Sequence, residues 1–139
     1  MSRLLLIGFD ATELSQGAGF AQSLGLPFDV ICLIGEPPLD LGAERALSAA
    51  LVEVPPADGL ARALCGLSAG YTHIAAVSSM RAKDLLARLA GLLDAAMVTD
   101  AISIAGPNLF VRPILAGSIL ATVEVLASPV VLTVRPAGF

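Results

Sequence analysis

The amino-acid sequence predicts an α/β fold, a three-layer α/β/α sandwich with a parallel central sheet and an antiparallel C-terminal extension. Two observations support this expectation. Up to about residue 97, compact apolar runs alternate with segments of helical periodicity, the pattern of βα units in a parallel sheet. Beyond residue 98, short strand-like segments are separated by turns rich in glycine and proline, which favours antiparallel pairing. The chain of 139 residues is expected to form one domain over 1–139.

The first part of the chain predicts two strands joined by a helix. Residues 3–10 form an apolar run typical of a strand covered on both faces. Thr12 offers a helix N-cap, and apolar residues then recur at helical spacing until Gly25 and Pro27 end the helix. Residues 28–34 form the second apolar strand.

The middle of the chain predicts further βα units. After a connector over 35–42, a short helix is expected near 44–49 and a strand over 51–54. Asp58 is expected to cap a helix that Gly70 closes, and 72–78 reads as a strand. Ser79 then begins the clearest helix, whose apolar stripe runs from Leu85 to Met97.

The tail predicts strands near 102–104, 109–115, 118–125 and 130–134, paired antiparallel because the turns between them are short. Together with the preceding units, the pattern is that of a Rossmann-like fold. No internal repeat or interior linker interrupts it.

Composition excludes several classes of function. Hydrophobic residues make up 56% of the chain and charged residues 14%, which excludes disorder. The net charge is −4 and the seven arginines form no basic cluster, so neither nucleic acid nor an anionic membrane surface is an expected partner. Glu124 and Pro129 break the longest apolar run, so no membrane span is expected. The two cysteines, Cys32 and Cys65, read as buried free thiols, which favours a cytoplasmic protein.

Phosphate-binding and redox motifs are weak. The turn after the first strand lacks the dinucleotide fingerprint, and the glycines at 17 and 19 are better explained by helix packing. Ser78 and Ser79 could hold an anion at a helix N-terminus, but a helix cap is the simpler interpretation.

Catalytic and metal-binding sets are also weak. His73 is the only histidine and is expected to be structural, so no histidine base or metal site can be assembled from the sequence. Asp94 and Asp100 read as solvated acids. The chain is therefore not expected to be an enzyme.

Arg112 and Arg135 are the most informative charges. Each lies in or at the end of an apolar strand and precedes a proline. A buried or half-buried arginine must reach water, a carboxylate or a partner. A structural ion pair or subunit contact is the favoured interpretation, and direct contact with a flavin or nucleotide is the alternative.

Residues 112–123, R-P-I-L-A-G-S-I-L-A-T-V, followed by L-T-V-R-P-A-G-F over 132–139, resemble the end of the N-terminal domain of the electron-transfer flavoprotein alpha subunit. The segments 82–90 and 98–100 resemble two other motifs of that domain, in the same order. Alanine at positions 82 and 87, Leu115 and Ser118 depart from the family pattern.

The resemblance implies an adenine nucleotide alpha hydrolase-like fold and a non-catalytic scaffold role in electron transfer. In the family, alpha and beta subunits form a heterodimer, and FAD is held mainly by a C-terminal domain of alpha. No FAD-binding domain is expected within 1–139, so no flavin ligand is assigned in this chain. Expected partners are a beta subunit and a separate FAD-binding domain, with self-association when the chain is isolated. The expected interface residues are Arg112, Pro113, Gly117, Thr122 and Arg135.

Two alternative functions stay open at this point. One is a free-standing domain that binds a small nucleotide at the ends of the first and fourth strands. A weaker one is a hydrolase on the same fold, for which no catalytic set is recognisable. The sequence does not decide whether the stop at Phe139 is natural.

Overall fold

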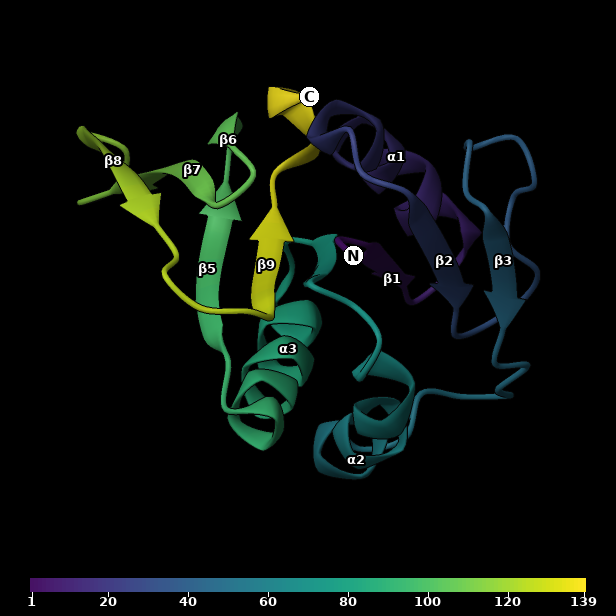
Figure 1. Cartoon of the computed structure of the whole chain (residues 1–139). Coiled ribbons are helices and arrows are strands. Elements are labelled where there is room, and N and C mark those ends of the chain that lie inside the picture. Colours follow the sequence, from purple (N-terminus) through teal and green to yellow (C-terminus); the bar gives the residue numbers. More distant parts are fainter.

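The computed structural model describes all residues, 1–139, and contains a six-stranded sheet in the order β3-β2-β1-β4-β9-β5 (Figure 1). Every pairing within this sheet is parallel. A second, antiparallel sheet has the order β6-β7-β8. The elements are β1 (Leu4–Gly8), α1 (Ala11–Leu24), β2 (Phe28–Cys32), β3 (Arg45–Ser48), α2 (Ala57–Ser68), β4 (His73–Val77), α3 (Met80–Leu93), β5 (Ala96–Ala101), β6 (Ser103–Gly106), β7 (Leu109–Ile114), β8 (Ile119–Glu124), β9 (Val130–Val134) and the 3₁₀ helix η1 (Pro136–Gly138).

Helices cover both faces of the parallel sheet, which confirms the three-layer α/β/α prediction (Figure 1). Strand β1 shows why, because all its residues are buried and alternate between two cores. Leu4 and Leu6 join the core under α1, whereas Leu5 and Ile7 join the core under α2 and α3. The continuous apolar runs of the sequence are thus strands that bury both faces.

Helix ends agree in part with the sequence predictions. Ser79 caps α3 as predicted, its side chain accepting from the Ala82 amide, and Gly25 ends α1 in the left-handed conformation. The cap of α1 is Asp10 rather than Thr12. Asp58 lies in the first turn of α2 and is not its cap; there it still stabilises the positive end of the helix dipole.

Residues 44–54 were wrongly predicted. The segment expected to be a helix is the edge strand β3, and the segment 51–54, expected to be a strand, has no regular structure. Strand β3 forms because β2 has a free edge and because the amide of Arg45 donates to Asp29 at 3.0 Å. Long-range pairing therefore overrides local propensity here. Met97, assigned to the helical stripe, lies in β5, because Asp94 ends α3 with a left-handed φ of 52°.

The C-terminal strands form two arrangements. β6, β7 and β8 form an antiparallel meander as predicted. β9, which was expected to join them, instead enters the parallel sheet between β4 and β5. Parallel neighbours need a crossover connection, and the meander itself supplies the connection from β5 to β9. The meander is consequently tied to the sheet at both of its ends.

The last residues pack on α1. Phe139 meets Phe20 edge-on, with ring centroids 5.2 Å apart, and its backbone lies against Gly19. A Cβ at Gly17 would approach Leu6 to 3.1 Å. Both glycines thus serve helix packing, as the sequence indicated.

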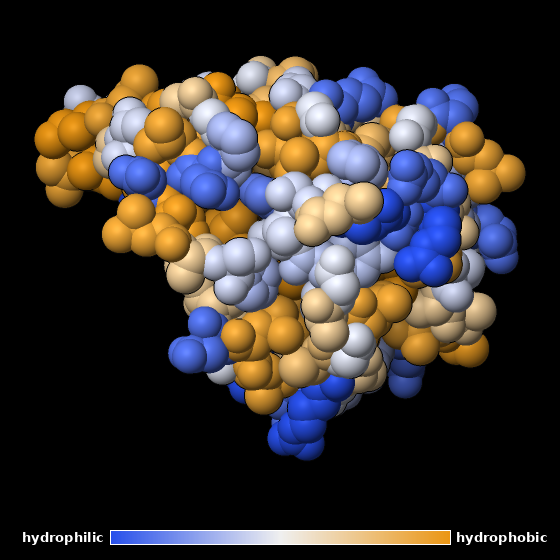
Figure 2. Space-filling model, viewed as in Figure 1, coloured by the Kyte–Doolittle hydropathy of each residue, from blue (hydrophilic) through white to orange (hydrophobic).

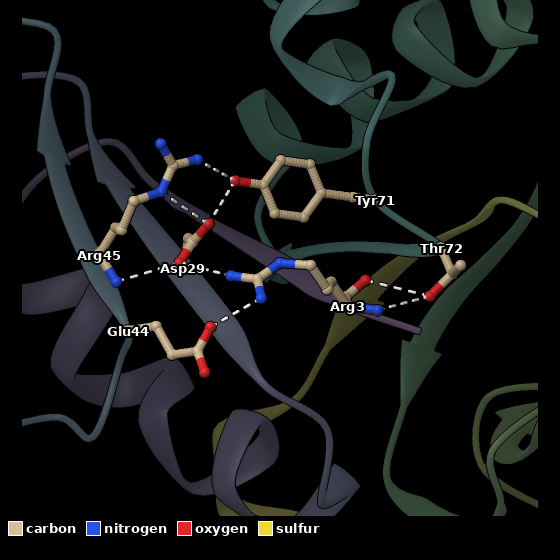
Figure 3. Close-up of polar contacts among 6 residues, drawn as sticks. All are labelled: Arg3, Asp29, Glu44, Arg45, Tyr71 and Thr72. Carbon is tan, nitrogen blue, oxygen red and sulfur yellow. Dashed lines mark hydrogen bonds and ion pairs between the residues drawn. The ribbon is translucent and has the colours of Figure 1, made fainter. Parts of the chain in front are cut away.

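A buried carboxylate organises the end of the sheet at which its parallel strands begin (Figure 3). Asp29, in β2, is 0% exposed. It accepts hydrogen bonds from Arg3 Nη2 at 3.0 Å, Arg45 Nε at 3.2 Å and the Tyr71 hydroxyl at 2.6 Å. Arg3 also pairs with Glu44 at 2.6 Å. This network joins β1, β2, β3 and the start of β4, and the sequence reasoning did not anticipate it.

Candidate interaction surface

The β7–β8 hairpin presents an apolar surface and an unpaired strand edge. β8 is an outer strand of its sheet, so one of its edges has no partner in the chain. Leu115 is 68% exposed, Leu120 61% and Ile119 46%. Figure 2 shows hydrophobic residues gathered over this end of the molecule. An exposed strand edge flanked by apolar side chains is typical of a protein-contact surface.

The hairpin is attached to the body mainly through β7, which packs against β5. Phe110, in β7, is the one side chain of β6–β8 that is fully buried. Arg112 reinforces this attachment, donating from Nε to the Thr99 carbonyl at 2.9 Å and from Nη2 to the Thr99 hydroxyl at 3.1 Å. The base of the hairpin is therefore ordered, while its tip faces outward.

The structure brings four of the five predicted interface residues together. Arg112 and Pro113 of β7, Gly117 in the turn and Arg135 after β9 line one hollow of about 490 Å³. Thr122 lies on β8 opposite Val111, outside that hollow. Of the C-terminal residues, β9 contributes no accessible surface because all its residues are buried in the sheet, and the exposed positions begin at Arg135.

The structural ion pair favoured for these arginines agrees with the structure at Arg135, whose Nε lies 3.6 Å from Asp100 Oδ1. Arg112 binds Thr99 through hydrogen bonds instead. The interpretation of Asp100 as a solvated acid was wrong. Its side chain is 14% exposed and forms an ion pair with Lys83 at 2.8 Å. The available signal was an acid inside a mostly apolar segment, 96–102, where a charge requires a partner.

Asp100 lies at an irregularity in β5. The register against β9 shifts between Val98 and Ala101, and Asp100 has φ of 58°, a strained value for a residue other than glycine. Its amide donates to the Thr133 hydroxyl at 2.9 Å. Burial alone would raise the pKa of Asp100, but the nearby Lys83 and Arg135 outweigh it and leave that pKa below its ordinary value. The charged pair therefore holds the bulge from which the chain enters the meander.

Acid is expected to destabilise the fold through Asp29 and Asp100. Burial opposes ionisation at Asp29 too, but hydrogen bonds from Tyr71, Arg3 and Arg45 leave its pKa lowered. Carboxyl groups with a lower pKa in the folded state stabilise it above their ordinary pKa, near 4, and lose that contribution as pH falls. The free energy of unfolding in urea should therefore decrease from about pH 5 downward. Asp100→Asn should make this decrease shallower, whereas Asn at the exposed, unpaired Asp40 should not.

The carboxyl ends of β1 and β4, where an open α/β sheet commonly binds nucleotides, are occupied by the chain's own side chains. The Phe9 ring is 2% exposed, and the Arg81 guanidinium lies 4.2 Å above its centre. Arg81 also pairs with Glu13 at 2.6 Å. Asp10 and Glu13 place two carboxyl groups at the N-terminus of α1, where they would repel a pyrophosphate. These residues do not fit FAD or a free nucleotide.

His73 has a structural position. Its Nε2 lies 2.7 Å from the Pro107 carbonyl and its Nδ1 lies 2.9 Å from the Thr72 hydroxyl. Because a carbonyl only accepts, Nε2 carries a proton. The buried Ser78 hydroxyl lies beyond the opposite end of β4, so His73 is not placed to act as its base. The geometry offers nothing to the hydrolase alternative.

Comparison with known proteins identifies the family. Residues 36–139 match the electron transfer flavoprotein domain. The chain belongs to the electron transfer flavoprotein family. It is 46% identical over 70 residues to the mitochondrial electron transfer flavoprotein subunit alpha of Arabidopsis thaliana, a match covering 50% of this chain and 19% of that protein.

Bacterial alpha subunits give similar results. The alpha subunit of Pseudomonas aeruginosa is 35% identical over 82 residues, covering 59% of this chain and 26% of the relative. That of Paracoccus denitrificans is 36% identical over 83 residues, covering 60% and 27%. The chain thus spans about a quarter or less of the length of the relatives it matches. The predicted resemblance to the N-terminal domain of the alpha subunit is confirmed. No helix of this chain has the length and apolar content needed to cross a membrane.

Proposed function

We propose that this chain is a scaffold and subunit-contact domain of an electron-transfer flavoprotein, working as part of an electron carrier and not as an enzyme. In the proposed assembly it pairs with a beta subunit and helps to hold a separate FAD-binding domain. Electrons from dehydrogenases would pass through that flavin. The observation that carries the proposal is the match of residues 36–139 to the family together with the outward-facing β7–β8 hairpin.

The distribution of charge and apolar surface supports this role. The protein has a net charge of −4, yet the hairpin surface is formed by Leu115, Ile119 and Leu120. Interface cores are depleted in charge and enriched in large apolar side chains. A free β8 edge adds backbone donors and acceptors that a partner strand or loop can use.

The proposed flavin lies outside the described fold. The ends of β1 and β4 do not suit a flavin, because Arg81 covers Phe9 and the carboxylate of Glu13 neutralises that arginine. We therefore assign no flavin contact to residues 1–139 and derive no electron-transfer step through them. A cytoplasmic location is likewise part of the proposal, supported by the two free cysteines, Cys32 and Cys65.

Leu120→Asp is expected to weaken binding to the cognate beta subunit by roughly 30-fold or more, because it places a charge at the centre of the apolar hairpin surface. It should change the free energy of unfolding by less than about 0.5 kcal/mol, as Leu120 is mostly exposed. Isothermal titration calorimetry measures the first quantity and urea denaturation the second. The same substitution should reduce self-association of the isolated chain in light scattering.

Leu39→Asp is the matched control. Leu39 is 87% exposed in the loop that leads to β3, and β3 is the edge of the parallel sheet opposite the one beside the meander. It should leave partner affinity within twofold of the unaltered chain. If the unaltered chain ignores the beta subunit, or if both aspartate variants bind equally well, the hairpin is not the contact surface.

A further inference from the structure

The hollow beside the turn of the β7–β8 hairpin contains cationic donors that the chain itself does not use. It is lined by residues 112–117 and by Arg135. Arg112 uses Nε and Nη2 on Thr99, which leaves Nη1 available. The Arg135 side chain is 53% exposed, and its Nε is 3.6 Å from Asp100, longer than a hydrogen bond. Each arginine therefore keeps guanidinium donors for a further acceptor.

Local charge is positive even though the protein is acidic overall. Asp100 is the acid near Arg135, and its Oδ2 is already bound to Lys83 at 2.8 Å. Glu124, the acid on the hairpin, lies opposite Leu109 in the strand register, at the end of β8 away from the turn and the hollow. Three cationic side chains lie in this region, those of Lys83, Arg112 and Arg135, and Asp100 neutralises one of them. About two positive charges therefore stay uncompensated beside the hollow, in a chain of net charge −4.

The turn that forms one wall adds backbone donors. Leu115, Ala116 and Gly117 have φ values of 51°, 54° and 85°. At Leu115 and Ala116, which are not glycine, the left-handed conformation costs about 1 kcal/mol or more per residue. The amides of Leu115 and Ala116 donate to no acceptor of the chain. Arg112, Arg135 and these two turn residues thus line one concave site.

We propose that this hollow receives a carboxylate side chain, Asp or Glu, of the beta subunit. The inference rests on the proposed function and adds the chemistry of the contact. Arginine guanidinium groups match carboxylates through paired hydrogen bonds. A protein carboxylate is chosen over a free anion because the hollow adjoins the exposed Leu115 and the hairpin surface. A small anion would leave those apolar side chains in water, whereas a partner protein covers them while it inserts the acid.

Charge reversal at Arg135 tests the proposal. Affinity of the full chain for the cognate beta subunit is measured by calorimetry at low and high salt. Arg135→Glu is expected to lower the affinity at least roughly tenfold, and Arg135→Gln to lower it less and to flatten its salt dependence. Arg62→Glu is the matched control, because Arg62 is 73% exposed and has an equally loose ion pair, 3.9 Å from Asp58. It should change the affinity by less than twofold.

A second step identifies the acid. Each surface Asp and Glu of the beta subunit is replaced by Lys, and one such variant should bind Arg135→Glu better than it binds the unaltered chain. Urea denaturation checks that each variant is folded. If Arg135→Glu is unfolded, the affinity of Arg135→Gln decides the test instead.

The outcomes separate the two proposals. If Leu120→Asp disrupts binding while both Arg135 variants bind like the unaltered chain, the carboxylate inference is overturned and the contact surface remains. If the unaltered chain does not bind the beta subunit, both proposals fall. If inorganic phosphate binds the free chain with a micromolar dissociation constant that Arg135→Gln abolishes, the hollow is a site for a free anion and the inference is also overturned.

Discussion

Replacing Asp29 with alanine is expected to lower the free energy of unfolding by about 3 kcal/mol. Removing one partner of a buried ion pair is strongly destabilising because it leaves charges and donors uncompensated. Asp29 accepts hydrogen bonds from the side chains of Arg3, Arg45 and Tyr71 and from the backbone of β3. We expect the low end of the usual range because Arg3 and Arg45 are partly exposed and can turn to water.

Graded variants distinguish this network from a general loss of packing. Tyr71→Phe removes a single hydrogen bond to Asp29 and should cost about 1–2 kcal/mol. Ala at the exposed Asp40 should change stability by less than about 0.5 kcal/mol. Urea denaturation at pH 7 gives all three values. A loss at Asp29→Ala no larger than at Tyr71→Phe would mean that the arginines do not depend on this carboxylate.

The sequence predicted the central sheet well because burial on both faces leaves a local signal. In β1, β2, β4 and β9 every residue is buried and most are apolar, and such compact runs can be recognised from the sequence alone. Helix α3 was equally clear, since Ser79 and the leucine stripe specify its start and its buried face. Local chemistry was sufficient for both kinds of element.

Elements that depend on distant partners were not predictable in this way. β3 is mostly exposed, and its conformation depends on Asp29, which lies 16 positions away from Arg45. The place of β9 between β4 and β5 depends on the path of the whole meander. Periodicity in a sequence reports which residues are buried but not which strand lies beside which.

The candidate site divides along the same line. The pattern of arginine before proline identified Arg112 and Arg135, and the fold brings both to one hollow. Thr99 and Asp100 lie in the motif-like segment 98–100, but that motif does not indicate that they are the partners of these arginines in the chain. Charge in an apolar strand indicates that a partner exists, and only the fold identifies it.

Phe110→Ala is expected to destabilise the protein by about 3–5 kcal/mol, the usual result of removing a fully buried aromatic side chain. Because Phe110 is the fully buried side chain that β6–β8 contributes to the core, its loss should loosen the meander more than the parallel sheet. Hydrogen exchange should then accelerate at β7 and β8 before it does at β1 and β4.

The same variant should weaken binding to the beta subunit even though Phe110 is buried and makes no direct contact. A loosened hairpin must be ordered again on binding, which lowers the affinity without removing any interface atom. Ala at Leu115, whose side chain is exposed, is the counterpart that removes interface atoms but leaves stability within about 0.5 kcal/mol. A Phe110→Ala protein that loses stability yet binds the beta subunit with unchanged affinity would show that the meander does not carry the contact.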